Sequence, residues 1–276
     1  MSDATAIQWT DSTWNIVTGC TRVSPGCAHC YIERTPPFRM AHRRFERVGS
    51  EETTGVTLHW DRLAKPPRGP KIFTPSLGDL FHEDVPYRFI GETFDAFAAH
   101  PDRIFQVLTK RPERARDVLQ QMYAPFAGYS YDERGAAIPT NVWLGVSIEN
   151  ARYTWRADVL REIPAAVRFI SAEPLLGPLV GSSRRPGPRE DRHLRLHGID
   201  WLIIGGESGP GARPMRLSWV EELLACGREH KVALFVKQLG SAPIHGLTLH
   251  DAKGGDWDEW PADLRIREFP MTGSRL

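Results

Sequence analysis

Three cysteines that lie close together are the residues of this sequence best suited to metal chemistry. Cys20, Cys27 and Cys30 fall within eleven residues, and thiolates are soft ligands that select zinc or iron–sulfur clusters. Cys20 is expected at the carboxyl end of a strand that ends at Thr18. Cys27 and Cys30 are expected on one face of the first turn of a helix that begins near Cys27, where the helix N-terminus favours the thiolate form. The spacing therefore predicts three thiolates that converge on one point.

Two kinds of metal centre fit three converging thiolates. A structural zinc site needs four protein ligands, and the fourth cysteine, Cys226, is remote and is interpreted as a small buried residue on a helix. A distant histidine, namely His42, His59 or His82, could complete a zinc site of three cysteines and one histidine. A 4Fe–4S cluster instead uses three thiolates and keeps one iron open for a substrate or cofactor. The cysteines therefore favour the cluster, with zinc as the alternative.

Seven short apolar runs, rich in β-branched and aromatic residues, alternate with helical stretches. Runs of this kind are typical of strands buried on both faces, and the alternation predicts a parallel sheet. The expected fold is α/β, a complete or partial parallel β/α barrel of the TIM type with an irregular C-terminal cap. Residues 1–240 are expected to form the barrel domain and residues 241–276 an extension packed on it. The runs are Asn15–Thr18, Lys71–Thr74, Ile104–Thr109, Val142–Val146, Arg168–Ser171, Trp201–Ile204 and Ala233–Val236.

Helix start signals stand between these runs. Pro86 precedes a helix with an apolar face, Pro112 opens the next helix, and Ser218 with Glu221 has the pattern of a capping box. Two stretches, Ala124–Thr140 and Gly181–Gly198, are interpreted as insertions or mobile loops.

Polar residues follow the predicted strands at the points where the strands end. In parallel β/α folds the carboxyl ends of the strands meet at one edge, where active sites lie. Each residue alone has a structural alternative as a helix start, a cap or a turn, but their recurrence at one edge predicts a binding site. The residues are Asp79, His82 and Glu83; Thr109, Lys110 and Arg111; Ser147, Glu149 and Asn150; Glu173; Gly205, Gly206, Glu207 and Ser208; and Lys237 and Gln238.

Composition and charge restrict the function classes. The formal net charge is +1, so no global field attracts the chain to nucleic acid or to acidic membranes. The N-terminus lacks the pattern of a signal peptide, and no apolar stretch has the length needed to span a bilayer. We therefore expect a cytoplasmic protein with no membrane partner, in which cysteines serve metal binding or catalysis rather than disulfides.

Several motifs spread along the chain resemble those of radical S-adenosylmethionine enzymes, and more closely those of a phage-associated branch with a widened three-cysteine motif. The resemblance runs from about Gln8 to Gly240, with six residues between Cys20 and Cys27 where the wider family has three. The motifs are Trp14-Asn with Thr18-Gly-Cys20, Ser24-Pro-Gly-Cys27-Ala-His-Cys30-Tyr31, Asp79-Leu-Phe-His-Glu83, Leu108-Thr-Lys-Arg-Pro112, Gly145-Val-Ser-Ile-Glu149-Asn150, Ser171-Ala-Glu-Pro-Leu-Leu176 and Gly205-Gly-Glu-Ser208.

The resemblance implies a 4Fe–4S cluster on the three cysteines, with S-adenosylmethionine bound at the open iron. It also implies reduction by a flavodoxin- or ferredoxin-type donor and cleavage of the cofactor to a 5′-deoxyadenosyl radical that abstracts a hydrogen atom from the substrate. The chemistry belongs to the cofactor, and the protein positions it.

The cofactor's chemistry assigns roles to the residues at the strand ends. Lys110 or Arg111 would bind its carboxylate, and Asp79 or Glu207 its ammonium group. Other candidates are Glu149 and Asn150 for the ribose hydroxyls, and Gly205 with Gly206 for close backbone approach. Ser147, Glu173 and Lys237 complete the set of candidate cofactor-binding residues.

Three hypotheses about the function, two of which differ in the substrate of a radical enzyme, remain open at the level of sequence. The first is a nucleic-acid base or nucleotide, because the Arg-rich stretches Arg34–Arg47 and Arg184–Arg195, with Phe38 and Phe45 interleaved in the first, could contact phosphates and stack on bases. The second is a small molecule or a peptide. The third is a non-enzymatic binding module stabilised by zinc or a cluster.

Overall fold

The strands of this chain follow one another across the sheet in the order of the sequence. The computed structural model describes residues 5–123, 138–180, 193–242, 244 and 247–271. Within these residues seven strands form one sheet in the order β1-β6-β7-β8-β9-β10-β11. This order never reverses, as in β/α barrels and unlike doubly wound folds. The fold is therefore mixed α/β, with the strand order of a partial parallel β/α barrel.

Six of the seven predicted runs are strands of this sheet. Their residues are buried along almost their whole length, as expected for apolar strands covered on both faces. The pairs β1–β6, β6–β7, β9–β10 and β10–β11 are parallel. The strands are β6 (Lys71–Thr74), β7 (Ile104–Thr109), β8 (Val142–Ser147), β9 (Val167–Ala172), β10 (Trp201–Gly205) and β11 (Ala233–Gln238).

The prediction for the first strand was wrong in position. The strand that joins the main sheet is β1 (Ser12–Thr13), whereas β2 (Val17–Thr18) pairs antiparallel with β5 (Thr57–Leu58) in a separate two-stranded sheet. The cause is Asn15, whose side-chain oxygen accepts a hydrogen bond from the Leu77 amide at 2.8 Å, so a side chain replaces the ladder there.

The helices begin close to the predicted positions, with one correction. Both α3 (Tyr87–Ala98) and α4 (Pro112–Tyr123) follow their proline signals. Helix α6 (Leu217–Glu229) starts one residue before Ser218 and has Arg216 as its N-cap without a side-chain hydrogen bond, so the predicted capping box is wrong. The other helices are α1 (Pro36–Met40), α2 (Trp60–Leu63) and α5 (Trp155–Arg161), and β3 (Glu46–Val48) and β4 (Glu51–Thr53) form a hairpin.

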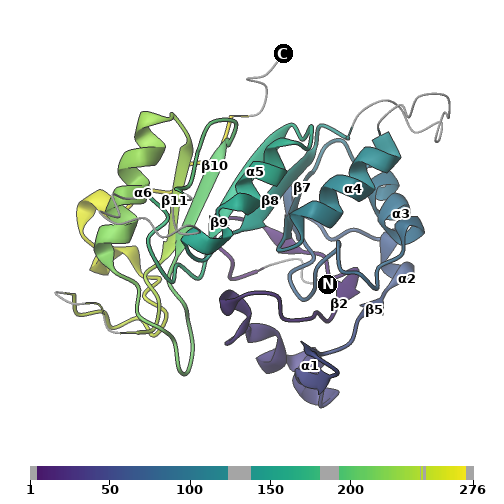
Figure 1. Ribbon diagram of the computed structural model, residues 1–276, viewed down its shortest axis with the longest axis horizontal. Helices are drawn as coiled ribbons and strands as arrows, with labels where there is room; N and C mark the ends of the chain where they lie inside the picture. The colour runs from purple at the N-terminus through teal and green to yellow at the C-terminus, as the bar shows by residue number, and fades with distance from the viewer. Residues whose placement is uncertain (1–4, 124–137, 181–192, 243, 245–246, 272–276) are drawn as a thin grey trace. The chain divides into compact units, whose positions relative to one another are not determined.

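The chain divides into two compact units. The first comprises Met1–Gly145 and Glu162–Ala166, and the second comprises Val146–Arg161 and Val167–Leu276. In the first unit α3 and α4 lie beside each other in Figure 1. In the second unit α6 packs on β11, where Gly227 leaves room for the side chain of Leu234.

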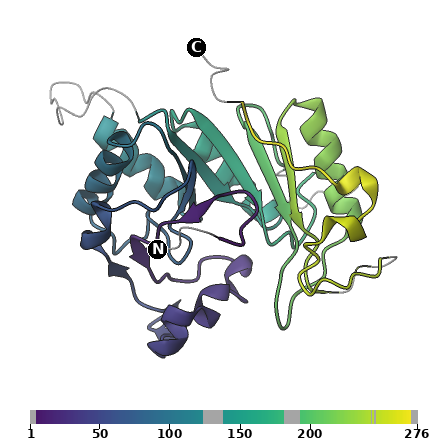
Figure 2. The same ribbon diagram turned by 180° about the vertical axis from the view of Figure 1, so that it is seen from behind.

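The C-terminal segment returns along β11. The amide of Val236 donates to the carbonyl of Ile266, and the amide of Glu268 donates to that of Leu234. Figure 2 shows this segment, in yellow, beside the strand. The predicted insertions fall largely outside the described residues, which omit 124–137 and 181–192. In the described part of the chain, every helix is too short or too polar to cross a lipid bilayer.

Gly19 allows the segment after β1 to pair again, beyond the interruption at Asn15, with the segment that follows β6. A parallel bridge joins Gly19 to Gly78, and the Gly19 amide donates to the carbonyl of Leu77 at 2.8 Å. Gly19 has a φ of 98°, and a Cβ there would overlap the carbonyl oxygen of Gly55. The bridge places the residues that follow it, Cys20 and Asp79, at the same edge of the sheet.

Gly19→Ala is therefore expected to destabilise the protein strongly. Positive φ costs about 1 to 2 kcal/mol for an L-residue, and overpacking against a fixed backbone adds about 1 to 3 kcal/mol. Gly49→Ala is the matched control, because Gly49 also has a positive φ, 61°, but a Cβ there would have nothing within 4 Å of it. Urea unfolding should show a loss for Gly19→Ala that exceeds the loss for Gly49→Ala, and equal losses would contradict this account.

Candidate functional site

The three cysteines lie on a loop of short 3-10 turns rather than on an α-helix. Cys27 is the last residue of the 3-10 helix η1 (Pro25–Cys27), and Cys30 is the N-cap of η2 (Tyr31–Arg34). The predicted helix beginning near Cys27 is wrong, because Cys30 adopts an extended ψ of 130° that ends the helical geometry. The thiols therefore do not share a helical face.

The loop nevertheless keeps the three thiols within electrostatic reach of one another. All four cysteines of the chain are described, and each is a free thiol. The charge of Cys27 contributes to raising the pKa of both Cys20 and Cys30. The fourth cysteine, Cys226, lies on α6 and is half-buried rather than fully buried as expected.

The two cations of the β7–α4 turn act on different cysteines. Burial, and then Asp79, raise the pKa of Cys20 to about 12, although Arg111 opposes them. Burial also disfavours the Cys27 thiolate, but the Lys110 ammonium and hydrogen bonds from the backbone outweigh it and hold the pKa of Cys27 below its ordinary value. Cys27 is thus the thiol of the three that most readily ionises.

The pKa of Cys30 is raised by burial, and Lys110 opposes this rise. Lys110 therefore acts electrostatically on two of the three thiols, and Arg111 contacts the third.

Asp79 is the centre of the hydrogen-bond network beside Cys20. Its side chain is 4% exposed. One carboxylate oxygen accepts from the Thr109 hydroxyl at 2.8 Å and from the Phe81 amide at 3.0 Å. The other accepts from the Lys110 amide at 3.1 Å and from Arg111 Nη1 at 3.3 Å. A carboxylate with this many donors is held in one orientation.

Arg111 uses all three of its nitrogens within the protein. Nε donates to both oxygens of Glu83, at 3.0 and 2.8 Å. Nη1 contacts Asp79 and also lies 3.6 Å from the sulfur of Cys20, and Nη2 donates to the carbonyl of Thr21 at 3.2 Å. The guanidinium therefore joins the end of β7 to the cysteine loop.

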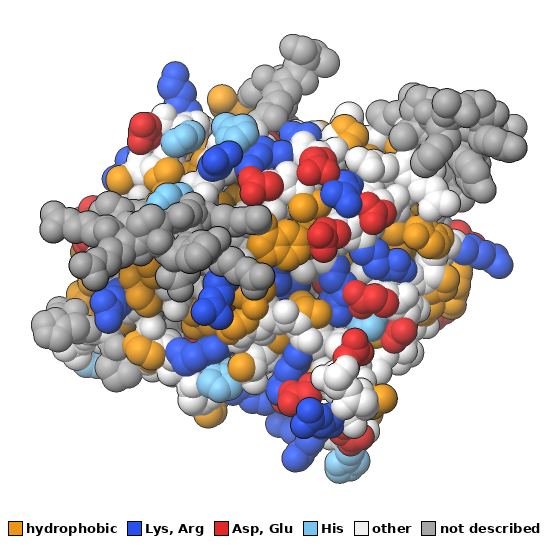
Figure 3. Space-filling model, in the orientation of Figure 1, with side chains coloured by type: hydrophobic (Ala, Val, Ile, Leu, Met, Phe, Trp, Pro, Cys, Tyr) orange, Lys and Arg blue, Asp and Glu red, His pale blue; other side chains and the backbone are white. Residues whose placement is uncertain are grey.

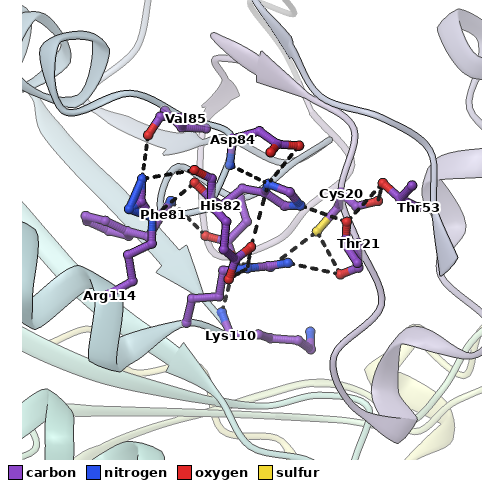
Figure 4. A network of polar contacts seen from close by, with 12 residues as sticks. Cys20, Thr21, Thr53, Phe81, His82, Asp84, Val85, Lys110 and Arg114 are labelled. Carbon is purple, nitrogen blue, oxygen red and sulfur yellow. Dashed lines mark hydrogen bonds and ion pairs between the residues drawn. The ribbon is translucent and has the colours of Figure 1, made fainter. Parts of the chain in front are cut away.

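A second path connects the same elements through His82, as Figure 4 shows. The Asp84 amide donates to His82 Nδ1 at 3.1 Å, so Nε2 carries the proton and donates to the Thr21 hydroxyl at 2.9 Å. Thr21 then donates to Thr53, and Thr53 to the carbonyl of Cys20. Burial, and then Arg111, lower the pKa of His82, which keeps the ring neutral at pH 7.

The histidines considered for a zinc site are engaged elsewhere or exposed. Both ring nitrogens of His82 have partners, His59 Nε2 lies 2.9 Å from the Thr18 hydroxyl, and His42 is exposed. Among the described residues, no three His, Cys, Asp or Glu side chains are already arranged to hold a metal ion. The thiols are neighbours, but they are not preassembled.

The remaining predicted site residues belong to the second unit, where most of them pair with each other or with nearby arginines. Glu149 is fully buried and accepts from Arg156 Nη1 at 3.1 Å, and Arg156 also donates to the carbonyl of the buried Ser147. Asn150 accepts from the Arg152 amide at 3.0 Å and so caps the 3-10 helix η3 (Ala151–Tyr153).

Two further ion pairs lie after β9 and β10. Lys237 Nζ lies 2.5 Å from Glu173, which Gln238 also contacts at 3.3 Å. Glu207 is 6% exposed and accepts from the amide and the guanidinium of Arg213.

The space beside the two glycines after β10 is already occupied by the protein itself. A Cβ at Gly205 would stand 3.1 Å from the side chain of Glu173, and one at Gly206 would overlap the carbonyl of Leu239. Both glycines therefore serve the packing of the second unit.

Sequence reasoning missed three residues that hold these groups in place: Thr21, Arg156 and Arg213. Arg156 and Arg213 follow the carboxylates that they bind by seven and six residues. No regular spacing relates such pairs, because the two members do not lie on one continuous helix or strand. Thr21 follows Cys20 directly, and this adjacency was the one available signal.

Asp79→Asn is expected to destabilise the protein by about 3 kcal/mol, because it removes one partner of a buried ion pair and turns an amide donor toward other donors. Glu83→Gln is the matched control. Glu83 also pairs with Arg111, but its side chain is 63% exposed, so the loss should stay below about 1 kcal/mol. Urea unfolding of both variants measures the difference, and a loss for Glu83→Gln as large as that for Asp79→Asn would contradict it.

Comparison with known proteins assigns a family and no activity. No curated protein and no solved structure matches the chain. A family model with the description "Protein of unknown function (DUF5131)" matches residues 4–261. The match covers most of the sequence, and the chain belongs to the DUF5131 family.

Proposed function

We propose that this protein is a radical S-adenosylmethionine enzyme whose cluster is held by Cys20, Cys27 and Cys30. The observation that carries the proposal is the grouping of three reduced thiols around two cations, Lys110 and Arg111, at the carboxyl ends of the first strands. In this proposal the sheet is the partial barrel of such enzymes. When bound and reduced by a flavodoxin- or ferredoxin-type donor, the cluster would supply cleavage of S-adenosylmethionine to a 5′-deoxyadenosyl radical for hydrogen abstraction.

The donor set fits an iron–sulfur cluster. Three thiolates would bring negative charge into a largely buried loop, and Lys110 and Arg111 supply positive charge on two sides of it. Because the thiols are not preassembled, we infer that the loop adjusts when the cluster is inserted, which is common for sites whose ligands must first lose protons.

The two cations differ in what they can offer a cofactor. Arg111 is 7% exposed, and its nitrogens are directed at Glu83, Asp79, Cys20 and Thr21. We therefore assign the cofactor's carboxylate to Lys110, which is half-buried.

The same criterion excludes Asp79 as the residue that binds the ammonium group. The oxygens of Asp79 already accept four hydrogen bonds, so its role is to fix Arg111 and the turn after β7. Glu207 and Glu149 are likewise bound by Arg213 and Arg156 within the second unit, so the roles of Glu207 toward the ammonium and of Glu149 and Asn150 toward the ribose stay predictions from the sequence.

Anaerobic reconstitution with iron and sulfide tests the proposal. The wild-type protein should develop the broad visible absorption of a 4Fe–4S cluster and, with dithionite and S-adenosylmethionine, should form 5′-deoxyadenosine. Cys20→Ala, Cys27→Ala and Cys30→Ala should each abolish both signals, whereas Cys226→Ala should retain them. A protein that takes up zinc instead, or cysteine variants that still form 5′-deoxyadenosine, would refute the proposal.

For the substrate we propose a nucleic-acid base or nucleotide. One of the two aromatic rings on which the sequence-based hypothesis relied is, however, not available for stacking. Phe38 is 1% exposed with Arg43 4.6 Å above its ring, and Arg22 lies 4.4 Å above Phe45, so the first ring is not available to bases. The support that remains is the exposed arginines around α1, although acidic side chains lie among the basic ones on this part of the surface (Figure 3). These arginines are Arg34, Arg39, Arg44 and Arg47.

Binding to nucleic acid should therefore depend on salt and on these arginines. Arg39→Gln combined with Arg44→Gln is expected to weaken binding to single-stranded DNA or RNA about tenfold at low salt, because each phosphate contact releases counterions. The matched control is Arg88→Gln, an exposed arginine on α3 that is paired with Glu92. Fluorescence anisotropy across salt concentrations measures the effect. Salt-independent binding, or none, would favour a small molecule or peptide as substrate.

A further inference from the structure

We propose that Arg111 is a positioning residue that donates an N–H···S hydrogen bond to the Cys20 sulfur and thereby sets the reduction potential of the cluster. This inference rests on the proposed function. Its basis is the contact of Arg111 Nη1 with the Cys20 sulfur at 3.6 Å, within the range of hydrogen bonds to sulfur. A positively charged donor at this distance acts directly on the charge of the sulfur.

The guanidinium is held in this position from three sides. Glu83 binds Nε, Asp79 binds Nη1, and the carbonyl of Thr21 binds Nη2. Asp79 is itself fixed by Thr109 and by two backbone amides. Because the planar guanidinium is anchored at every nitrogen, its N–H group stays directed at the sulfur. The ammonium group of a lysine in the same place would not be held in one orientation in this way.

The direction of the effect follows from charge. Reduction adds one electron to the cluster from a low-potential donor of the flavodoxin or ferredoxin type, and no bond of Arg111 forms or breaks. Hydrogen bonds to the cysteine sulfurs and nearby positive charge stabilise the more negative, reduced state. Arg111 therefore raises the potential and makes the cluster easier to reduce.

This role explains why an arginine is buried here. Burial of a charge carries a desolvation cost that an ion pair and its hydrogen bonds must offset, whereas an apolar side chain would fill the turn without that cost. Because the N–H groups of Arg111 point into the protein, the residue acts on Cys20 rather than on a diffusing ligand.

The test is a redox titration of the reconstituted protein, followed by electron paramagnetic resonance. Arg111→Gln should shift the midpoint potential of the cluster to more negative values, and Arg111→Lys should give a smaller shift in the same direction. Arg114→Gln is the matched control, because it removes the same charge from α4, where Arg114 binds the carbonyls of His82, Glu83 and Val85 rather than the sulfur of Cys20. Its potential should equal that of the wild type.

Each outcome decides the proposal. An Arg111→Gln potential equal to the wild type, or shifted no more than that of Arg114→Gln, overturns it while leaving the proposed function intact. If Arg111→Gln fails to hold a cluster, Arg111→Lys decides: a more negative potential supports the proposal, and an unchanged one overturns it. A wild-type protein that takes up no cluster overturns both this proposal and the proposed function.

Discussion

The buried ion pair between Asp79 and Arg111 is the interaction on which the organisation of the first unit's site depends. Both side chains are almost fully inaccessible to water, so each would carry a large desolvation penalty without the other. Their attraction is supplemented by donors from Thr109 and from the backbone to Asp79, and by acceptors at Glu83 and Thr21 to Arg111. The pair therefore fixes the turns after β6 and β7 and ties the cysteine loop to them.

The ion pair could not reach the cysteine loop without the backbone geometry that precedes it. The segment from β1 to Gly19 leaves the sheet at Asn15 and returns at the bridge between Gly19 and Gly78. Neither glycine tolerates a side chain without overlap or close contact with backbone carbonyl groups. The close approach brings Cys20 to the same edge of the sheet as Asp79, and this is where a thiol and a cation can meet.

The amino-acid sequence predicts the regular parts of this fold well, because buried parallel strands and amphipathic helices have periodic patterns. The boundaries of β6 and β7 follow from that pattern, and the start of α4 follows from the proline signal at Pro112. The position of the first strand was predicted wrongly because the side chain of Asn15 replaces the backbone in the hydrogen-bond ladder. The hydrophobic pattern of the sequence does not indicate such a replacement. The helix at Cys27 was wrong for a related reason: three residues of separation suit an α-helix and a pair of 3-10 turns equally well.

For the site, the pattern of the sequence locates the charged residues but does not say which of them are available to a ligand. Asp79, Arg111, Glu149 and Glu207 all follow strands as predicted, yet each is bound by a partner that the sequence does not reveal. Pairing of this kind lowers the cost of burying charge, so polar residues at a strand end are as compatible with a structural role as with a binding site.

A functional role is favoured over a structural one when the charged group also acts on an atom whose own charge matters for the chemistry. Arg111 meets that criterion through the sulfur of Cys20, and Lys110 meets it through its effect on the pKa of Cys27. These two neighbouring cations therefore support a redox centre more strongly than does the number of polar residues at the edge of the sheet.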